Sequence, residues 1–450
     1  MIKPEKAAFQ IKLRPAFKPA TIPFAPRNPV IAALVILAAL GLVAYVLKLG
    51  SWGEPNRAAW AYPTVALMFI LSTAAGAPLI AYASRAARGY WALPARRVAE
   101  LYIIPATLSY ILLIPIFATL PPLEGRANLW FDFHAGAPFL TDALAVATMI
   151  LAGVGMLWIS AVPDLAVSWR SRGDVSGWRR ALIFNWTGTT RQWIAIRVGT
   201  RVFGAFYLMS YVYAHLVLST DLGQSLLPGW RSGIFPAYHA LTGIQGGLAL
   251  TIVTLFLVKR YSSLGKFIGN EQAISLGKLL LATTLLWFYF FWSDFVLVWY
   301  ARIPSEVAAM QLSIAMTYRL PFYIAFFGLF AIPFVFLIFN AVRRNLWALA
   351  SVSVVVLIGL VFDRIRLFVP SMTHPDPTAH SLGTTLPEAF GPSALDVLFI
   401  VGWIAIIALA FLWIASRIPP LVGWELREGA LLRREQRFMK AHVYVLGKPD

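Results

Sequence analysis

The feature that most constrains this chain is a series of long apolar runs. Ten of them follow one another, near 29–48, 60–83, 101–121, 142–166, 199–219, 233–258, 277–300, 314–341, 346–369 and 393–416. A helix rises about 1.5 Å per residue, so about 20 apolar residues cross the ~30 Å hydrocarbon core of a bilayer. With 59% hydrophobic and 13% charged residues, the sequence predicts an all-α polytopic membrane protein with about ten transmembrane helices.

Basic residues gather in alternate loops, which is the pattern of the positive-inside rule. They lie before residue 29, in the second, fourth, sixth and eighth loops, and after residue 416. We therefore expect cytoplasmic tails at 1–28 and 417–450, with a retained first span rather than a cleaved signal peptide. The net charge of +18 follows from this distribution rather than from one patch, so no nucleic-acid partner is expected.

Runs two and six share a layout, with aromatic residues and proline at one end, small residues in the middle and basic residues at the other end. This likeness predicts two four-helix bundles inside a membrane domain of residues 29–416. Bundle one covers spans 2–5, about 60–219, and bundle two covers spans 6–9, about 233–369, with spans 1 and 10 flanking them. We interpret Gly243, Gly246 and Gly247 as close-packing positions rather than as a backbone site for a ligand.

The chain contains no cysteine. It can therefore supply no thiolate to an iron–sulfur cluster, no disulfide and no c-type haem attachment. His215 and His239 could hold a haem only if both rings faced one cavity. The outer loop at 370–392 contains His374, Asp376 and His380, but we interpret it as a docking or solvated surface rather than as a metal site.

Ionisable residues inside the apolar runs are the candidate functional groups, because each costs roughly 2.5–3.5 kcal/mol to insert unless it faces protein or water. They predict two polar zones separated by an apolar middle. The candidates are Asp164 and Lys278 toward the cytoplasmic side, and His239, Asp294, Glu306, Arg319 and Asp363 toward the outer side. Such zones suit proton transfer or a quinol head group.

Asp294 interrupts the apolar run of the seventh span. Two interpretations remain open for it: an ion pair with Arg302 or Arg319, or a group that transfers protons. Trp299 and Tyr300 are similarly open, since they fit an interfacial aromatic belt but could also line a quinol site.

The segment WSDFVLVWYARIPSE, with LLPGWRSGIF upstream, resembles the signatures of the NrfD/PsrC-like family, most closely the ActF-type membrane subunits of bacterial alternative complex III. The matching positions are Ser293, Asp294, Trp299, Tyr300, Pro304 and Glu306. In that pattern glutamine is usual where Asp294 stands and asparagine where Arg302 stands. This chain would thus carry an opposite-charge pair in place of a neutral one.

The resemblance implies a subunit of a quinol:acceptor oxidoreductase complex in the bacterial cytoplasmic membrane. Its expected partners are a homologous ActC-like membrane subunit, an iron–sulfur subunit and haem c subunits. The chain itself is expected to carry no cofactor and no catalytic residue, although a quinone could bind it. Its implied roles are scaffolding and proton conduction.

Two other functions remain open. One is a secondary transporter whose site lies between the two helical repeats, which predicts broken helices near the middle of the bilayer. The other is a purely structural anchor for extracytoplasmic subunits.

Overall fold

The computed structural model describes residues 21–22, 28–125, 138–173, 176–382, 386–438 and 441–446. The predicted N-terminal tail, residues 1–28, therefore lies almost wholly outside the described residues. The tip of the predicted 121–141 loop lies outside them as well.

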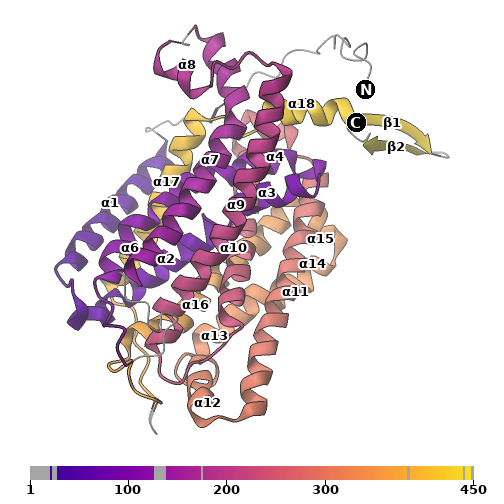
Figure 1. Ribbon diagram of the computed structural model, residues 1–450. Coiled ribbons are helices and arrows are strands. Elements are labelled where there is room, and N and C mark those ends of the chain that lie inside the picture. The colour runs from indigo at the N-terminus through magenta and orange to yellow at the C-terminus, as the bar shows by residue number, and fades with distance from the viewer. Residues whose placement is uncertain are drawn as a thin grey trace.

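Ten helical spans among the described residues are long and apolar enough to cross a membrane, which confirms the all-α polytopic prediction (Figure 1). The first five are α1 (Pro29–Leu49), α2 (Ala61–Thr73) with α3 (Pro78–Ala86), α4 (Leu93–Leu101) with α5 (Ile103–Thr107) and α6 (Ser109–Phe117), α7 (Phe139–Ser171), and α9 (Thr190–Leu222). The last five are α10 (Phe235–Tyr261), α11 (Asn270–Ala301), α13 (Arg319–Phe326) with α14 (Ile332–Ile338), α16 (Leu346–Thr373), and α17 (Ala394–Arg417).

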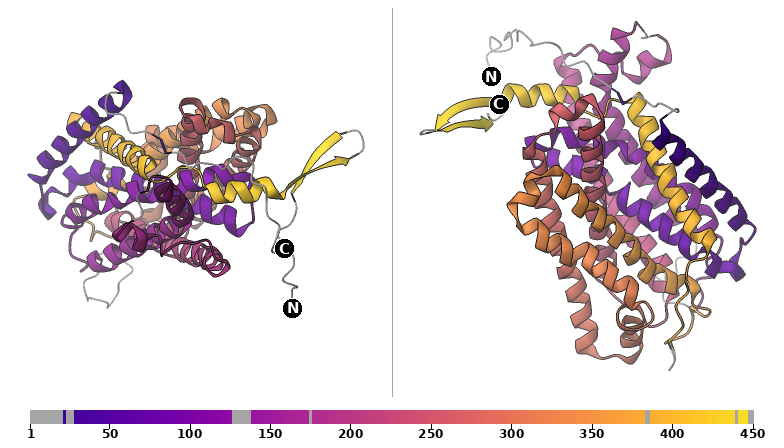
Figure 2. Two further views of the ribbon diagram at one scale, coloured as in Figure 1. Left: turned by 90° about the horizontal axis from the view of Figure 1, so that it is seen from above. Right: turned by 180° about the vertical axis from the view of Figure 1, so that it is seen from behind.

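Short elements connect these spans. They are the 3₁₀ segments Glu54–Trp60, Tyr90–Ala92, Gln224–Leu226 and Ser263–Phe267, the π-helical segments Gln311–Ala315 and Phe327–Ala331, and the helices α8 (Trp178–Leu182), α12 (Pro304–Met310), α15 (Asn340–Arg344) and α18 (Gly423–Leu432). After α18, the strands β1 (Arg433–Phe438) and β2 (Ala441–Leu446) pair antiparallel as a hairpin. Figures 1 and 2 show this hairpin projecting away from the helices.

The third and fifth spans begin earlier than predicted, at Tyr90 and Thr190. In the third span, Arg96 and Arg97 lie inside α4 rather than in a cytoplasmic loop, and they are 5% and 0% exposed. Both form ion pairs with buried glutamates. Partners elsewhere in the fold thus allow charged residues within a helix, and a hydropathy window starts the span too late.

Both ends of the membrane domain lie on one side of the molecule. The Ile22 N–H donates to the Ala415 carbonyl at 3.2 Å, which places the start of α1 beside the end of α17. We call this side the terminal face, and the side where α1 ends at Leu49 and α17 begins at Ala394 the distal face.

Helices α1 and α17 pack closely as a pair beside the other spans (Figure 2). A Cβ atom on Gly41 would lie 2.5 Å from the Gly402 Cα, so neither position has room for a side chain. Near the distal face, Lys48 Nζ and Asp396 Oδ1 form a buried ion pair at 2.8 Å. The flanking spans are thus joined by backbone contact and by charge.

At the centre of the molecule, α2 contacts α10 and α16. The second span is interrupted between α2 and α3, and the turn there packs against two glycines of α10. A Cβ on Gly76 would lie 2.3 Å from the Gly243 carbonyl oxygen, and a Cβ on Gly247 would lie 2.3 Å from the Ala77 nitrogen. Glycine therefore allows direct backbone contact here, as in closely packed membrane helices.

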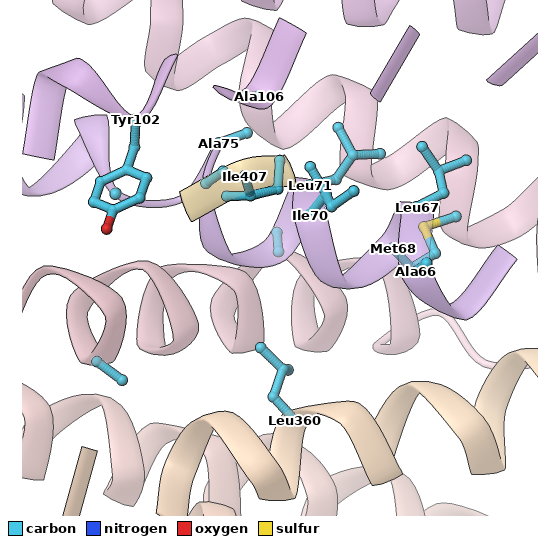
Figure 3. Packing of buried hydrophobic residues seen from close by; sticks show 14 of the residues in the cluster. Ala66, Leu67, Met68, Ile70, Leu71, Ala75, Tyr102, Ala106, Leu360 and Ile407 are labelled. Atoms are coloured by element: carbon cyan, nitrogen blue, oxygen red, sulfur yellow. The ribbon is translucent and has the colours of Figure 1, made fainter. Parts of the chain in front are cut away.

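Apolar side chains from α2, α5, α16 and α17 fill the middle of the molecule, and Figure 3 shows part of this packing. Leu71 and Leu360 are 1% and 0% exposed. A cavity of about 140 Å³ remains beside Ile70, Tyr102 and Trp403, lined almost entirely by apolar groups. The middle of the molecule is therefore apolar.

Candidate functional site

A small pocket of about 60 Å³ lies near the distal face between α11, α12, α16 and the segment that precedes α10. Its polar lining residues are Arg231, Ser232, Asp294, Glu306, Ser313 and Arg366, and its apolar walls include Trp230, Phe291 and Phe295. We call it the distal pocket. It combines two carboxylates, an arginine from α16 and aromatic walls in one place.

Asp294 reaches the distal pocket from α11. Its Oδ1 accepts a hydrogen bond from Ser232 Oγ, and Ser232 Oγ accepts one from the Phe235 N–H at 3.0 Å. Among the described residues, Asp294 forms no ion pair with Arg302 or Arg319, and both arginines are exposed. Neither expected ion pair is therefore present, and Ser232, three residues before α10, donates to the carboxylate instead.

The motif after Asp294 forms the elbow that brings Glu306 to the same pocket. Helix α11 ends at Ala301, and Arg302 caps it with a left-handed backbone of φ 52°. Pro304 then starts α12, where its fixed φ suits the first helical turn. Glu306 follows in that first turn and lines the pocket.

Trp299 and Tyr300 do not line the distal pocket. They are 56% and 84% exposed. The interpretation of these two residues as walls of a quinol site is therefore not supported, while their exposure near the distal end of α11 fits an interfacial aromatic belt. Phe291 and Phe295, one to two turns earlier on α11, provide the pocket's aromatic walls.

A buried hydrogen-bonded chain runs inward from the distal pocket. Arg366 Nη2 donates to the Tyr238 hydroxyl at 2.9 Å and to Asp363 Oδ1 at 2.7 Å, and the Tyr238 hydroxyl donates to Asp363 Oδ1 at 2.6 Å. Arg364 donates to Asp363 Oδ2 at 3.0 Å and to Ser72 Oγ at 2.8 Å. We call these five residues the distal cluster. One carboxylate here neutralises only one of two buried arginines.

The imidazole rings of His215 and His239 meet next to the distal cluster. Their Nδ1 atoms are 2.8 Å apart, which is a hydrogen-bond distance, and both residues are buried. The two axial nitrogens of a haem lie on opposite sides of the iron at about 2 Å each, so nitrogens 2.8 Å apart are too close to hold a haem iron between them. The helices adjoin as a haem site would require, but the rings bind each other.

A second polar group, the terminal cluster, lies between the second, third and fourth spans near the terminal face. It consists of Arg85, Arg96, Arg97, Glu100, Asp164 and Glu425. Glu100 pairs with Arg85, accepts from Arg97 Nε at 3.1 Å and accepts from Ser160 Oγ at 2.7 Å. Three arginines face three carboxylates, so the cluster is balanced in charge.

The C-terminal segment completes the terminal cluster from outside the spans. Glu425 of α18 pairs with Arg85 at 2.8 Å and with Arg96 at 3.2 Å. The backbone N–H groups of Gly423 and Trp424 donate to the Asp164 carboxylate. The predicted tail at 417–450 thus begins as a docked element rather than as a free one.

The Glu425 carboxyl responds to these contacts. Burial by itself would raise the pKa of Glu425, but the Arg85 and Arg96 guanidinium groups outweigh it, and the pKa lies below its ordinary value.

The predicted candidates divide into two sets. Asp294, Glu306 and Asp363 come together at the distal pocket and cluster, with His239 alongside, and Asp164 joins the terminal cluster. Lys278 and Arg319 are exposed and join neither. Ser293 lies beside Asp294, and within the described part of the chain its hydroxyl donates only to the Tyr289 carbonyl of its own helix, at 2.7 Å.

Sequence reasoning missed Arg366, Tyr238 and Glu425. The spacing of Asp363 and Arg366 was a usable signal, because residues three apart lie on one face of a helix. Tyr238 offered no such signal, since its partners come from α16. Glu425 was assigned to a tail, and only the fold shows that it returns to the second and third spans.

No protein-family model matches the chain, and no curated protein matches its sequence. Function is therefore inferred from the residues and their geometry.

Proposed function

We propose that this chain is the non-redox membrane subunit of a quinol-oxidising electron-transfer complex of the alternative complex III type. In this role it anchors extracytoplasmic iron–sulfur and haem c subunits beside a homologous membrane subunit. It also accepts and passes on protons at the distal pocket.

The observation that carries the proposal is the convergence of the motif on one pocket. Asp294 and Glu306, which carry the resemblance, lie 12 residues apart in the chain, yet both line the distal pocket together with Arg366. The αL residue Arg302 and Pro304 make the turn between them. The motif thus describes one site rather than two unrelated segments.

The chemistry of the distal pocket suits protons. Asp294 and Glu306 are half-buried carboxylates, and such groups exchange protons with neighbours within hydrogen-bond reach. Ser232 donates to Asp294, and a second hydrogen-bonded chain, through Tyr238 and Asp363, starts at Arg366 in the wall of the same pocket. Arg366 lines the pocket and belongs to that chain, so a proton that enters the pocket alters the field at Asp363.

We do not extend the proton role to Asp164 or Lys278. Asp164 accepts bonds from two backbone N–H groups and pairs with Arg97 in the terminal cluster, away from the distal pocket. Lys278 is exposed on α11. The proton role is therefore confined to the distal half of the molecule.

A secondary transporter is the second candidate, because the interrupted second span meets Arg364 through Ser72. Broken helices beside charged groups form the sites of many transporters. The break, however, is filled by backbone contact with Gly243 and Gly247, at separations that exclude even a methyl group. A transported solute would need those helices to separate.

Purification in a mild detergent tests the proposal. We expect the chain to co-purify with subunits that show haem c absorbance and iron–sulfur resonances, and the membranes to oxidise quinol. An isolated chain that accumulates solute in proteoliposomes would contradict it and favour the transporter.

A further inference from the structure

The connection between α7 and α9, which includes α8, lies at the terminal face (Figure 1) and is rich in basic and aromatic residues. From Arg170 to Arg201 the chain carries seven arginines, one acidic residue and no lysine. Arg172, Arg180 and Arg191 are exposed, and among the described residues no carboxylate pairs with them. Their charge is therefore available to a partner.

This connection is folded rather than extended. Ile183 and Trp186 are buried against α7 and α9, in a small apolar core separate from the main one. Trp158 Nε1 donates to the Leu182 carbonyl at 3.0 Å, and the rings of Trp158 and Phe184 lie 4.8 Å apart.

Two consecutive residues of the connection adopt a strained backbone. Phe184 and Asn185 have φ of 50° and 48°. Such outliers persist only where surrounding contacts hold them, and they gather at functional positions. A loop that served only as a solvated basic connection would not require this fold.

The side chains around the connection are typical of a membrane–water interface. Tryptophan gathers around the connection at Trp158, Trp169, Trp178, Trp186, Trp193 and Trp424. Tryptophan is enriched where hydrocarbon meets lipid headgroups. Trp178 and Phe184 point outward and are 66% and 53% exposed, so apolar groups stand beside the free arginines.

We propose that Arg172, Arg180, Arg191, Trp178 and Phe184 form a binding surface for the headgroups of anionic phospholipids. Guanidinium groups bind phosphate oxygens in a bidentate manner, which lysine cannot do. Basic clusters next to membrane helices attract anionic lipids, and acyl chains would cover the two exposed aromatic side chains. This proposal is independent of the proposed electron-transfer role.

Native mass spectrometry of the detergent-solubilised full chain tests the surface, with phosphatidylglycerol and phosphatidylcholine as probes. Each basic residue near an anionic surface is worth about a fivefold change in affinity. The triple variant Arg172→Gln, Arg180→Gln, Arg191→Gln should therefore weaken phosphatidylglycerol binding by at least about tenfold and leave phosphatidylcholine binding unchanged. Trp178→Ser should also weaken phosphatidylglycerol binding, because it removes an exposed aromatic side chain that the acyl chains would cover.

The matched control is Lys259→Gln, Arg260→Gln, Arg344→Gln, which removes three exposed charges from other connections at the same face. It should bind phosphatidylglycerol like the wild type, and both triple variants should keep the wild-type melting temperature. An equal loss in both triple variants would overturn the proposal. So would displacement of the lipid by inorganic phosphate or polyglutamate at matched ionic strength, which would indicate a phosphate or acidic-protein site.

Discussion

The two buried polar clusters of this protein differ in how their charges are satisfied. In the terminal cluster, three arginines meet three carboxylates, and serine and backbone groups occupy further positions. In the distal cluster, two arginines share Asp363, and the adjoining pocket holds Asp294 and Glu306 beside free volume. A balance of three arginines and three carboxylates indicates a structural role, whereas an excess arginine beside a pocket with two further carboxylates leaves groups able to change protonation.

Burial alone does not distinguish the two clusters. Arg97 and Arg364 are both 0% exposed. What distinguishes them is access, because α18 covers the terminal cluster while Arg366 of the distal cluster lines a pocket. A charged residue inside a membrane span is a functional candidate by default, but its partners decide whether its role is functional or structural.

Of the substitutions that test this comparison, Glu100→Gln is expected to lower stability the most. The change leaves Arg85 and Arg97 without their shared carboxylate, and removing one partner of a buried ion pair costs about 3–5 kcal/mol. We expect a marked fall in the melting temperature in detergent. Glu124→Gln, at an exposed loop position, is the control and should change stability by less than about 0.5 kcal/mol. Equal melting temperatures for the two variants would show that the terminal cluster is not structural.

Glu425→Gln should have an intermediate effect, because α18 can undock without unfolding the spans. We expect a loss of about 1–3 kcal/mol and faster proteolysis within residues 423–438. Lowering the pH should have the same effect on the wild type as this substitution. Since the folded pKa of Glu425 lies below its ordinary value of 4.5, its contribution is complete above that value and disappears as the pH falls through the lowered folded pKa. Tail proteolysis that stays constant from neutral pH down to pH values well below 4.5 would contradict the docking.

The smallest effect is expected from Lys278→Gln and Arg319→Gln. Both side chains are exposed and form no ion pair among the described residues. Such substitutions usually change stability by less than about 0.5 kcal/mol. Quinol oxidation, proton release and melting temperature should all stay at wild-type values. A loss of proton release in Lys278→Gln would show that the proton path extends beyond the distal pocket.

The sequence predicts the ten spans well, because apolar length is a local signal. It predicts helix ends poorly where charges pair across spans, as Arg96 and Arg97 show. The partners of Asp294 were not predictable from its own helix. Arginines near Asp294 in the chain were the expected partners of its carboxylate. The observed partner is Ser232, which the packing of the segment before α10 brings to Asp294.

The most direct test compares Asp294→Asn with Ser293→Ala in the intact complex in proteoliposomes. Both positions belong to the motif, but only Asp294 lines the distal pocket. We predict that Asp294→Asn lowers the number of protons released per quinol oxidised while the melting temperature and subunit content stay unchanged. Ser293→Ala should behave like the wild type. Undiminished proton release in Asp294→Asn would contradict a proton role for the distal pocket.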